Sequence, residues 1–191
     1  MTAEPGPRCP WAAGSPEMIA YHDREWGTPQ HDDRALFELL TLEGAQAGLS
    51  WRTVLARREH YRRTFHFFDI ARIAAMTDSE LESILRSSGV IRNRLKVWSV
   101  RSNAEAALAV IAAAGSLDVF LWSFVEGRPV VTRWREAADV PARTPLSDAM
   151  SSTLRKKGFR FVGSTICYAF MQATGMVDDH LATCFRARPR P

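Results

Sequence analysis

Apolar side chains recur along this chain with the three- and four-residue spacing of amphipathic helices. One such run occupies positions i, i+3, i+4 and i+7, at Leu117, Phe120, Leu121 and Phe124. This spacing gathers the four side chains on one face of a helix, which can then be buried against a core. We therefore predict a helix over this segment.

Other segments combine apolar spacing with signals for helix ends. Thr77 and Glu80 are spaced as an N-terminal capping box. The apolar face behind this cap continues at Leu81, Ile84 and Leu85. A further helix is predicted from about Ser147 to Lys157, and Gly158 is placed to end it, because glycine readily adopts the conformation found after helices.

Signals for sheet are weak, so the predicted fold class is all-α. No segment combines alternating β-branched residues with the turn residues of hairpins. The length suits a single compact unit, residues 1–191, built from two closely associated lobes. We expect one lobe to span 48–140 and the other to combine 1–47 with 141–191. The proline-bearing segment DVPARTP (139–145) is the predicted connection between them.

The charge distribution points to a polyanionic partner. The formal net charge is only +4, but basic residues cluster at 57–63, 92–96, 155–160 and 186–190. No acidic block of similar density exists. A solvated helix face would explain any one cluster, whereas four on a small chain favour binding to nucleic acid.

Apolar runs and cysteines indicate the compartment. No apolar run approaches the length of a membrane span, and the first eleven residues, MTAEPGPRCPW, contain no apolar core of a signal peptide. We expect a cytoplasmic, soluble protein without a membrane partner. Three cysteines do not suggest a disulfide framework.

Two cysteines lie near opposite ends of the chain, each with a histidine nearby. Cys9 is followed by His22, and His180 is followed four residues later by Cys184. Two thiolates and two imidazoles make the closed tetrahedral set of a structural zinc site, which would tie the N-terminal arm to the C-terminal segment. The spacing is not that of a standard zinc finger, so four unrelated residues remain the alternative.

The stretch TLEGAQAGLSW, from Thr41 to Trp51, contains a single charge, Glu43, among small and apolar residues. This composition is typical of a pocket wall rather than of a solvated surface. A buried carboxylate is costly unless hydrogen bonds or a positive charge compensate it. We therefore predict that Glu43 faces a ligand.

A glycine-centred turn in SSGVIRNRLKVW (87–98) joins two helical patterns, and the second pattern begins with Arg92, Asn93 and Arg94. Free backbone N–H groups at such a turn bind anions, and flanking arginines add charge without reading sequence. This combination suits a DNA phosphate. Taken alone, the pattern is better explained by an ordinary hairpin of two helices used for packing.

Five longer motifs resemble the DNA-3-methyladenine glycosylase I family of the helix–hairpin–helix DNA glycosylase superfamily. They are YHDREWG (21–27), LFELLTLEGAQAGLSWRTVLARRE (36–59), GVIRNRLK (89–96), LWSFVEG (121–127) and KKGFRFVGSTICYAFMQATGMVDDH (156–180). The similarity extends in order from Cys9 to Cys184. It implies an all-helical helix–hairpin–helix fold, no organic cofactor, and one structural zinc ion. The implied zinc ligands are Cys9, His22, His180 and Cys184.

The resemblance also implies an activity: flipping of N3-methyladenine out of alkylated double-stranded DNA and hydrolysis of its N-glycosidic bond. Glu43 matches the carboxylate that hydrogen-bonds the base, Tyr21 a second contact, and Trp51 the ring that stacks on it. The nucleoside of this base is cationic. A carboxylate and an electron-rich indole both favour a cation over neutral adenine.

Further positions match the pocket wall and the surface that binds DNA. Trp11 matches one aromatic of the wall, whereas Met18 stands where the family usually has tyrosine, which leaves open whether other N3-alkylated purines are substrates. Gly48 and Leu49 match the loop pressed into the duplex. The residues that match the DNA-binding hairpin are Gly89, Val90, Arg92, Asn93 and Arg94.

We expect a monofunctional, monomeric enzyme. The hairpin has no lysine at the position of a nucleophile, and Asp118 is interpreted as a first-turn helix residue. Water is then the nucleophile, and an abasic site remains. The main alternative is a non-catalytic, zinc-stabilised protein that binds damaged DNA. Glu43 argues against it, because a protein that only binds does not need a carboxylate in an apolar pocket. A zinc hydrolase is disfavoured, because four protein ligands leave no open position on the metal.

Overall fold

A computed structural model describes residues 6–87 and 89–187, and most of them are helical. The α-helices are α1 (Pro16–Arg24), α2 (Asp33–Gln46), α3 (Trp51–Leu55), α4 (Arg58–Thr64), α5 (Ile70–Ala74), α6 (Asp78–Arg86), α7 (Arg94–Ala114), α8 (Leu117–Trp122), α9 (Pro145–Lys156) and α10 (Ser164–Ala173). The 3-10 helices are η1 (Pro10–Ala12), η2 (His66–Phe68), η3 (Ser123–Val125) and η4 (Ala137–Asp139). The two strands are β1 (Val130–Val131) and β2 (Val177–Asp178).

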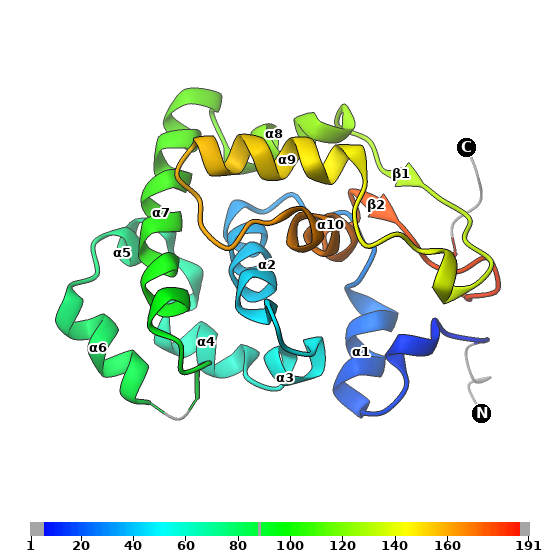
Figure 1. Ribbon diagram of the computed structural model, residues 1–191, viewed down its shortest axis with the longest axis horizontal. Helices are drawn as coiled ribbons and strands as arrows, with labels where there is room; N and C mark the ends of the chain where they lie inside the picture. Colours follow the sequence, from blue (N-terminus) through cyan, green and yellow to red (C-terminus); the bar gives the residue numbers. More distant parts are fainter. Residues whose placement is uncertain (1–5, 88, 188–191) are drawn as a thin grey trace.

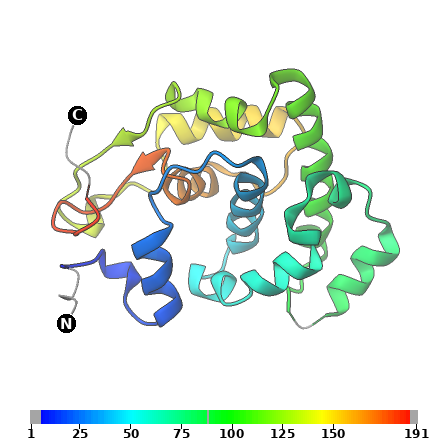
Figure 2. The ribbon, with the colours of Figure 1, turned by 180° about the vertical axis from the view of Figure 1, so that it is seen from behind.

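The helices α2 and α10 occupy the centre of the molecule (Figure 1). α7 stands at one end, α1 lies towards the other, and α8 and α9 run across one side of the centre. The view from behind shows α4, α5 and α6 beside α7, away from the chain termini (Figure 2). α2 packs against α3, α7, α8 and α10. It therefore contacts helices on several of its sides.

The central position of α2 follows from its composition. Asp32 caps its N-terminus by accepting a hydrogen bond from the backbone N–H of Ala35. All residues from 36 to 45 are buried, which is expected for a helix that is apolar on nearly every side. Glu43 belongs to this buried stretch, so the fold places a carboxyl group inside the protein.

The predicted helix ends agree with the structure where local signals specify them. Thr77 and Glu80 form the expected reciprocal capping box at the start of α6. α9 begins slightly earlier than predicted because Thr144 caps it, and Gly158, with φ of +94°, follows its C-terminal residues. Both helices are confirmed.

The predicted helix at 117–124 is confirmed with one correction. α8 stops at Trp122, and the last turn continues as the 3-10 helix η3, which contains Phe124. Leu117 and Leu121 are fully buried, whereas Phe120 and Phe124 are only partly buried against the core. The tighter turn rotates Phe124 out of strict register with the α-helical stripe.

Sheet content is low, as expected. β1 and β2 pair in parallel, with Val130 opposite Val177 and Val131 opposite Asp178. This pair joins the segment after α8 to the C-terminal segment. It thereby fixes the backbone just before His180.

The segment 139–145 connects η4 to α9, and its role as a connection between two lobes stays a prediction. In the described part of the chain, no single helix combines the length and hydropathy needed to cross a membrane. Such a test is passed only by Arg94–Ala114 taken together with Leu117–Val125, two segments bent by 83°.

Candidate active site

Glu43 lies in the last turns of α2 with 3% of its surface exposed. Its Oε2 atom is buried and has no hydrogen-bond partner among the described residues. Burial disfavours the anion and raises the pKa of the Glu43 carboxyl from 4.5 to about 8. A buried acid without a partner is costly, so it marks a position where a ligand can supply the missing interaction.

Two further polar groups share this condition. The hydroxyl of Tyr21, on α1, and the indole Nε1 of Trp51, the first residue of α3, are buried without partners within residues 6–87 and 89–187. Their ring centroids are 5.1 Å apart. Burial, followed by the nearby Glu43 charge, raises the pKa of Tyr21 well above its ordinary value. Tyr21 is therefore a neutral hydroxyl, able to donate or accept a hydrogen bond.

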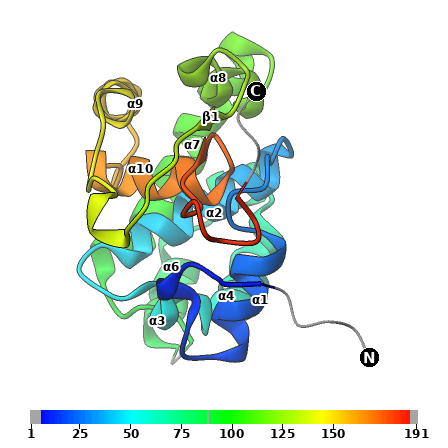
Figure 3. The same cartoon turned by 90° about the vertical axis from the view of Figure 1, so that its right-hand side faces the viewer.

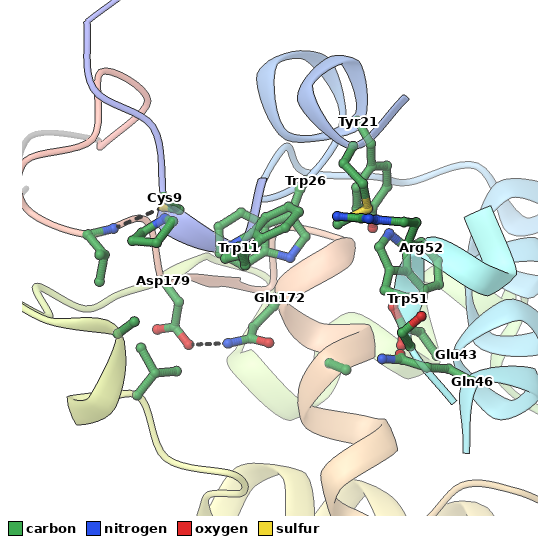
Figure 4. A pocket seen from close by; sticks show the side chains of 17 residues that line it. Cys9, Trp11, Tyr21, Trp26, Glu43, Gln46, Trp51, Arg52, Gln172 and Asp179 are labelled. Atoms are coloured by element: carbon green, nitrogen blue, oxygen red, sulfur yellow. Dashed lines mark hydrogen bonds between the residues drawn. The ribbon is translucent and has the colours of Figure 1, made fainter. Parts of the chain in front are cut away.

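These three residues line one cavity of about 770 Å³. Its remaining lining residues are Cys9, Pro10, Trp11, Met18, Trp26, Gln46, Ser50, Arg52, Ala137, Val140, Ala169, Gln172, Asp179 and Leu181. Figure 4 shows Glu43, Gln46, Trp51 and Arg52 gathered on one side of the pocket, with Trp11 and Trp26 between them and Asp179. A concave, largely apolar and aromatic site with a few polar groups suits a small planar ligand.

The site depends on a break between two helices. α2 ends at Gln46 and α3 begins at Trp51, so 41–51 is not one continuous helix. Gly48 has φ of +76°, a conformation that costs other residues energy. Leu49, next to it, is 40% exposed. The break brings Trp51 back to the cavity and leaves an apolar side chain at the surface.

Gly44 has a different role from Gly48. It lies within α2, and a Cβ atom there would come 3.2 Å from Cβ of Phe161. Its small size allows close packing of α2 against the loop before α10, and the helix continues past it to Gln46.

The hairpin segment consists of α6, a turn, and α7; Ser88, which the sequence includes in this turn, lies outside the described residues. Gly89 is packed so closely that a Cβ atom would come 2.0 Å from the ring of His60. Val90 is buried, with 3% of its surface exposed. Gly89 thus allows the turn to pack closely against α4, and the Val90 side chain is directed into the protein.

The polar residues at the start of α7 are partly engaged within the protein. Asn93 caps the helix, because its Oδ1 atom accepts a hydrogen bond from the backbone N–H of Lys96. The helix therefore begins at Arg94 rather than at Arg92. Arg94 pairs with Glu82 and lies 3.9 Å above the ring centroid of Trp98. Both arginines are exposed.

Three of the four predicted metal ligands converge at the junction of the termini. The ligand atoms of Cys9, His22 and Cys184 all lie within 4.8 Å of one another. Figure 3 shows the N-terminal arm and the C-terminal segment meeting at this end of the molecule. The Nδ1 atom of His22 is 2.8 Å from Asp23, so its Nε2 atom faces the thiols. Burial, together with the neighbouring Cys184, raises the pKa of Cys9 to about 12.

His180 is outside this group of three but adjacent to it. Its ring centroid is 5.2 Å from that of His22. Its Nδ1 atom is 2.8 Å from Asp178, and its Nε2 atom is buried without a hydrogen-bond partner in the described chain. A Cβ atom on Gly27 would come 2.5 Å from the ring, so glycine is required there. Two thiols and two imidazoles, each imidazole oriented by a carboxylate, fit a structural zinc ion.

The cavity also contains a buried carboxylate that sequence reasoning missed. Asp179 accepts four hydrogen bonds, at 2.5 to 2.9 Å, from Thr132, Trp134, Tyr168 and Gln172. These donors come from two segments, the stretch after β1 and helix α10, and only the acidic pair preceding His180 hints at the site. With four donors Asp179 is satisfied, in contrast to Glu43.

The match to a family model named Methyladenine glycosylase covers residues 11–187. The chain belongs to the methyladenine glycosylase family. It is 48% identical over 177 residues to DNA-3-methyladenine glycosylase 1 of Escherichia coli K12, covering 93% of this chain and 95% of that protein. The family resemblance inferred from the sequence is confirmed, and the protein is a hydrolase of the glycosylase class.

Solved structures of family members agree with the fold. One 3-methyladenine DNA glycosylase I has 50% sequence identity and a TM-score of 0.93, covering 95% of this chain and all of that one. Another, from Staphylococcus aureus, is described as showing how 3-methyladenine is recognised; it has 33% identity and a TM-score of 0.92 over 96% of this chain and 97% of that one.

Proposed function

We propose that this protein is a DNA-repair N-glycosylase that removes N3-methyladenine from alkylated duplex DNA. The observation that carries the proposal is the carboxyl group of Glu43, which has no partner among the residues that the structure describes and lines a cavity together with Tyr21 and Trp51. The family membership and the recognition of 3-methyladenine described for the S. aureus protein support the same substrate.

The charge of the substrate explains why a buried carboxyl group is useful. In the empty pocket burial raises the pKa of Glu43 to about 8, so the neutral form dominates at pH 7. A cationic methylated nucleotide restores the anion, because the attraction between opposite charges offsets the cost of burying each. Neutral adenine lacks this charge, so the pocket discriminates against it. The Trp51 ring adds a face on which the cation stacks.

Bond cleavage needs little from the protein beyond this recognition. The bond between C1′ of the sugar and N9 of the base breaks, and its electron pair goes to the base, which leaves neutral. The sugar becomes oxocarbenium-like, and water adds to C1′ and loses a proton. The product is an abasic site. Binding that favours the departing base and supports the positive sugar lowers this barrier.

A monofunctional reaction is supported by the placement of the two candidate nucleophiles, Lys96 and Asp118. The lysine nearest the hairpin, Lys96, is buried and donates to backbone carbonyls. Asp118 lies in the first turn of α8 and pairs with His31 on the surface, away from the cavity residues. We therefore propose that no covalent enzyme–sugar intermediate forms and that no lyase step follows.

We propose that the base is reached by flipping it out of the duplex. Flipping has an energetic cost of about a few kcal/mol. The exposed Leu49, carried on the Gly48 turn, is placed to fill the gap left in the base stack. The α6–turn–α7 segment acts as the helix–hairpin–helix that holds the backbone, with Arg92 and Arg94 near the phosphates. The protein acts as a monomer.

A structural zinc ion would be held by Cys9, His22, His180 and Cys184. The buried, unpartnered Nε2 of His180 supports this assignment. The ion would supply a tie between the two ends of the chain, and it takes no part in the chemistry. Because Trp11 follows Cys9 by two residues, this tie also positions one wall of the pocket.

The test is incubation with duplex DNA treated with a methylating agent, followed by chromatography of the released bases. We expect release of 3-methyladenine by the wild-type protein, no release from untreated DNA, and strongly reduced release by Glu43→Gln. Specific binding without release by the folded wild type would instead support the alternative, a non-catalytic protein that binds damaged DNA.

The substrate range depends on Met18, which is buried and lines the cavity. Methionine is flexible and adapts to different shapes. We propose that N3-methylguanine and bulkier N3 adducts are accepted as well. Comparing their release by the wild type and by Met18→Tyr tests this extension.

A further inference from the structure

Lys96 lies in the basic segment 92–96, yet only 9% of its surface is exposed. It projects from the first turn of α7 towards the end of α2. Its Nζ atom donates hydrogen bonds to the backbone carbonyls of Ala45, at 2.9 Å, and Ala47, at 2.6 Å. A cationic side chain that sequence alone assigns to a DNA-facing cluster is thus directed into the protein.

The two carbonyls lie at the C-terminal end of α2, between Glu43 and the loop that carries Leu49. Ala45 belongs to the last turn of α2, two residues after Glu43, and Ala47 is the C-cap residue directly before Gly48. Carbonyls at a helix C-terminus lack partners within the helix, and a positive charge there is favourable. Lys96 therefore holds the point where the helix that carries Glu43 becomes the loop that carries Leu49.

The other end of Lys96 is equally well fixed. Asn93 accepts a hydrogen bond from the Lys96 backbone N–H, and the backbone N–H of Ile91 donates to the hydroxyl of Tyr61 on α4. The hairpin turn and the first turn of α7 form one hydrogen-bonded unit. Between this unit and the Ala47–Leu49 loop, the Lys96 side chain is a direct polar connection.

We propose that Lys96 is a positioning residue for base excision. Its side chain fixes the position of the Ala47–Leu49 loop, which carries the wedge residue Leu49, and of the end of α2, which carries Glu43, relative to the hairpin. This inference rests on the proposed function. When the hairpin binds a DNA backbone, Leu49 and the pocket are then both positioned opposite the base to be flipped out. Lys96 itself contacts neither phosphate nor base, because its ammonium group is occupied by the two carbonyls.

The experiment compares Lys96→Met, which keeps the length of the side chain but cannot donate, with Lys96→Arg, which can. Arg72→Met, on the exposed surface of α5, is the control for loss of one positive charge. Three quantities are measured below the melting temperature of every variant. They are the single-turnover rate of excision at saturating enzyme, the affinity for free 3-methyladenine, and the salt dependence of binding to undamaged duplex.

For Lys96→Met we expect the excision rate to fall about 10- to 100-fold, as for a displacement on the order of 1 Å at a reacting site. Affinity for the free base and the salt dependence should stay within about twofold of wild type, since neither requires the wedge to be in register. Lys96→Arg should recover part of the rate, and Arg72→Met should match the wild type.

An unchanged excision rate in Lys96→Met would overturn the proposal. So would a parallel loss of free-base affinity, which indicates collapse of the pocket, or a salt slope smaller by about one, which indicates a lost phosphate contact. If Lys96→Met does not fold, Lys96→Leu, which also cannot donate, replaces it, and the same outcomes decide. A wild-type protein that releases no base refutes the proposed function instead, so the two failures are distinguishable.

Discussion

Replacing Glu43 with glutamine should stabilise the folded protein at neutral and alkaline pH while it strongly reduces excision activity. The carboxyl group is buried, its Oε2 atom lacks a partner in the described chain, and its pKa is raised from 4.5 to about 8. Glutamine has nearly the same shape and no charge. The substitution therefore isolates the cost of keeping an ionisable group in this pocket.

The sign follows from proton binding. Between pH 4.5 and 8 the folded state retains a proton that the unfolded chain has released, so the stability contributed by this group is complete below pH 4.5 and is lost as pH rises towards 8. At roughly 1.4 kcal/mol for each pKa unit, the loss between pH 5 and pH 7 is about 2.5 kcal/mol. For a chain of this length that corresponds to roughly 5–10 °C in Tm.

The assay is thermal and urea unfolding of the wild type and Glu43→Gln at pH 5, 7 and 8.5, with excision measured on the same preparations. Glu105→Gln, at an exposed position on α7, is the matched control and should show no widening difference with pH. A difference between wild type and Glu43→Gln that stays constant from pH 5 to 8.5 would refute the reasoning. Glu43 would then have an ordinary pKa and would not be desolvated.

Three further outcomes are expected. Because the ionised form of Glu43 binds the cationic base, kcat/KM for excision should rise with pH and level off near pH 8; a pH-independent profile would contradict this role. Leu49→Ala should weaken binding to duplex containing an abasic-site analogue by about tenfold, because the buried apolar side chain contributes roughly 1.5 kcal/mol. The affinity for the free base should stay constant. Equal losses in both affinities would rule out Leu49 as a wedge inserted into the duplex. Metal analysis should find one zinc ion per chain, and chelation or Cys184→Ser should lower Tm and expose the N-terminal arm around Cys9 to proteases; an unchanged Tm after complete removal of zinc would argue against the tie.

The candidate site was predictable from the sequence to the extent that motif residues carry it. Glu43, Tyr21, Trp51, Trp11 and Met18 all line one cavity. The carboxyl group stands out in sequence because it is the single charge in an apolar stretch, a local property.

Interactions between distant segments escaped sequence reasoning. The sequence predicts Lys96 to be a surface cation, because its hydrogen-bond partners, Ala45 and Ala47, lie about fifty residues earlier in the chain. The sequence does not predict the role of Asp179 for the same reason, since two of its hydrogen-bond donors lie in the stretch after β1, far from it along the chain, and two lie on α10. His180 is the opposite case: its spacing from Cys184 predicts it as a metal ligand, and the structure places it beside the group of Cys9, His22 and Cys184 but not within it.

By itself the sequence determined where helices form and how several begin or end, because capping and apolar periodicity act between residues three or four apart. Thr77 with Glu80 and the glycine at 158 are examples. Only the tertiary structure decided which charges lose contact with water. Desolvation depends on what the rest of the chain places around a group. For that reason Glu43 is a buried acid without a partner in the described chain, whereas Lys96, from a basic cluster, is buried with its ammonium group bonded to two backbone carbonyls.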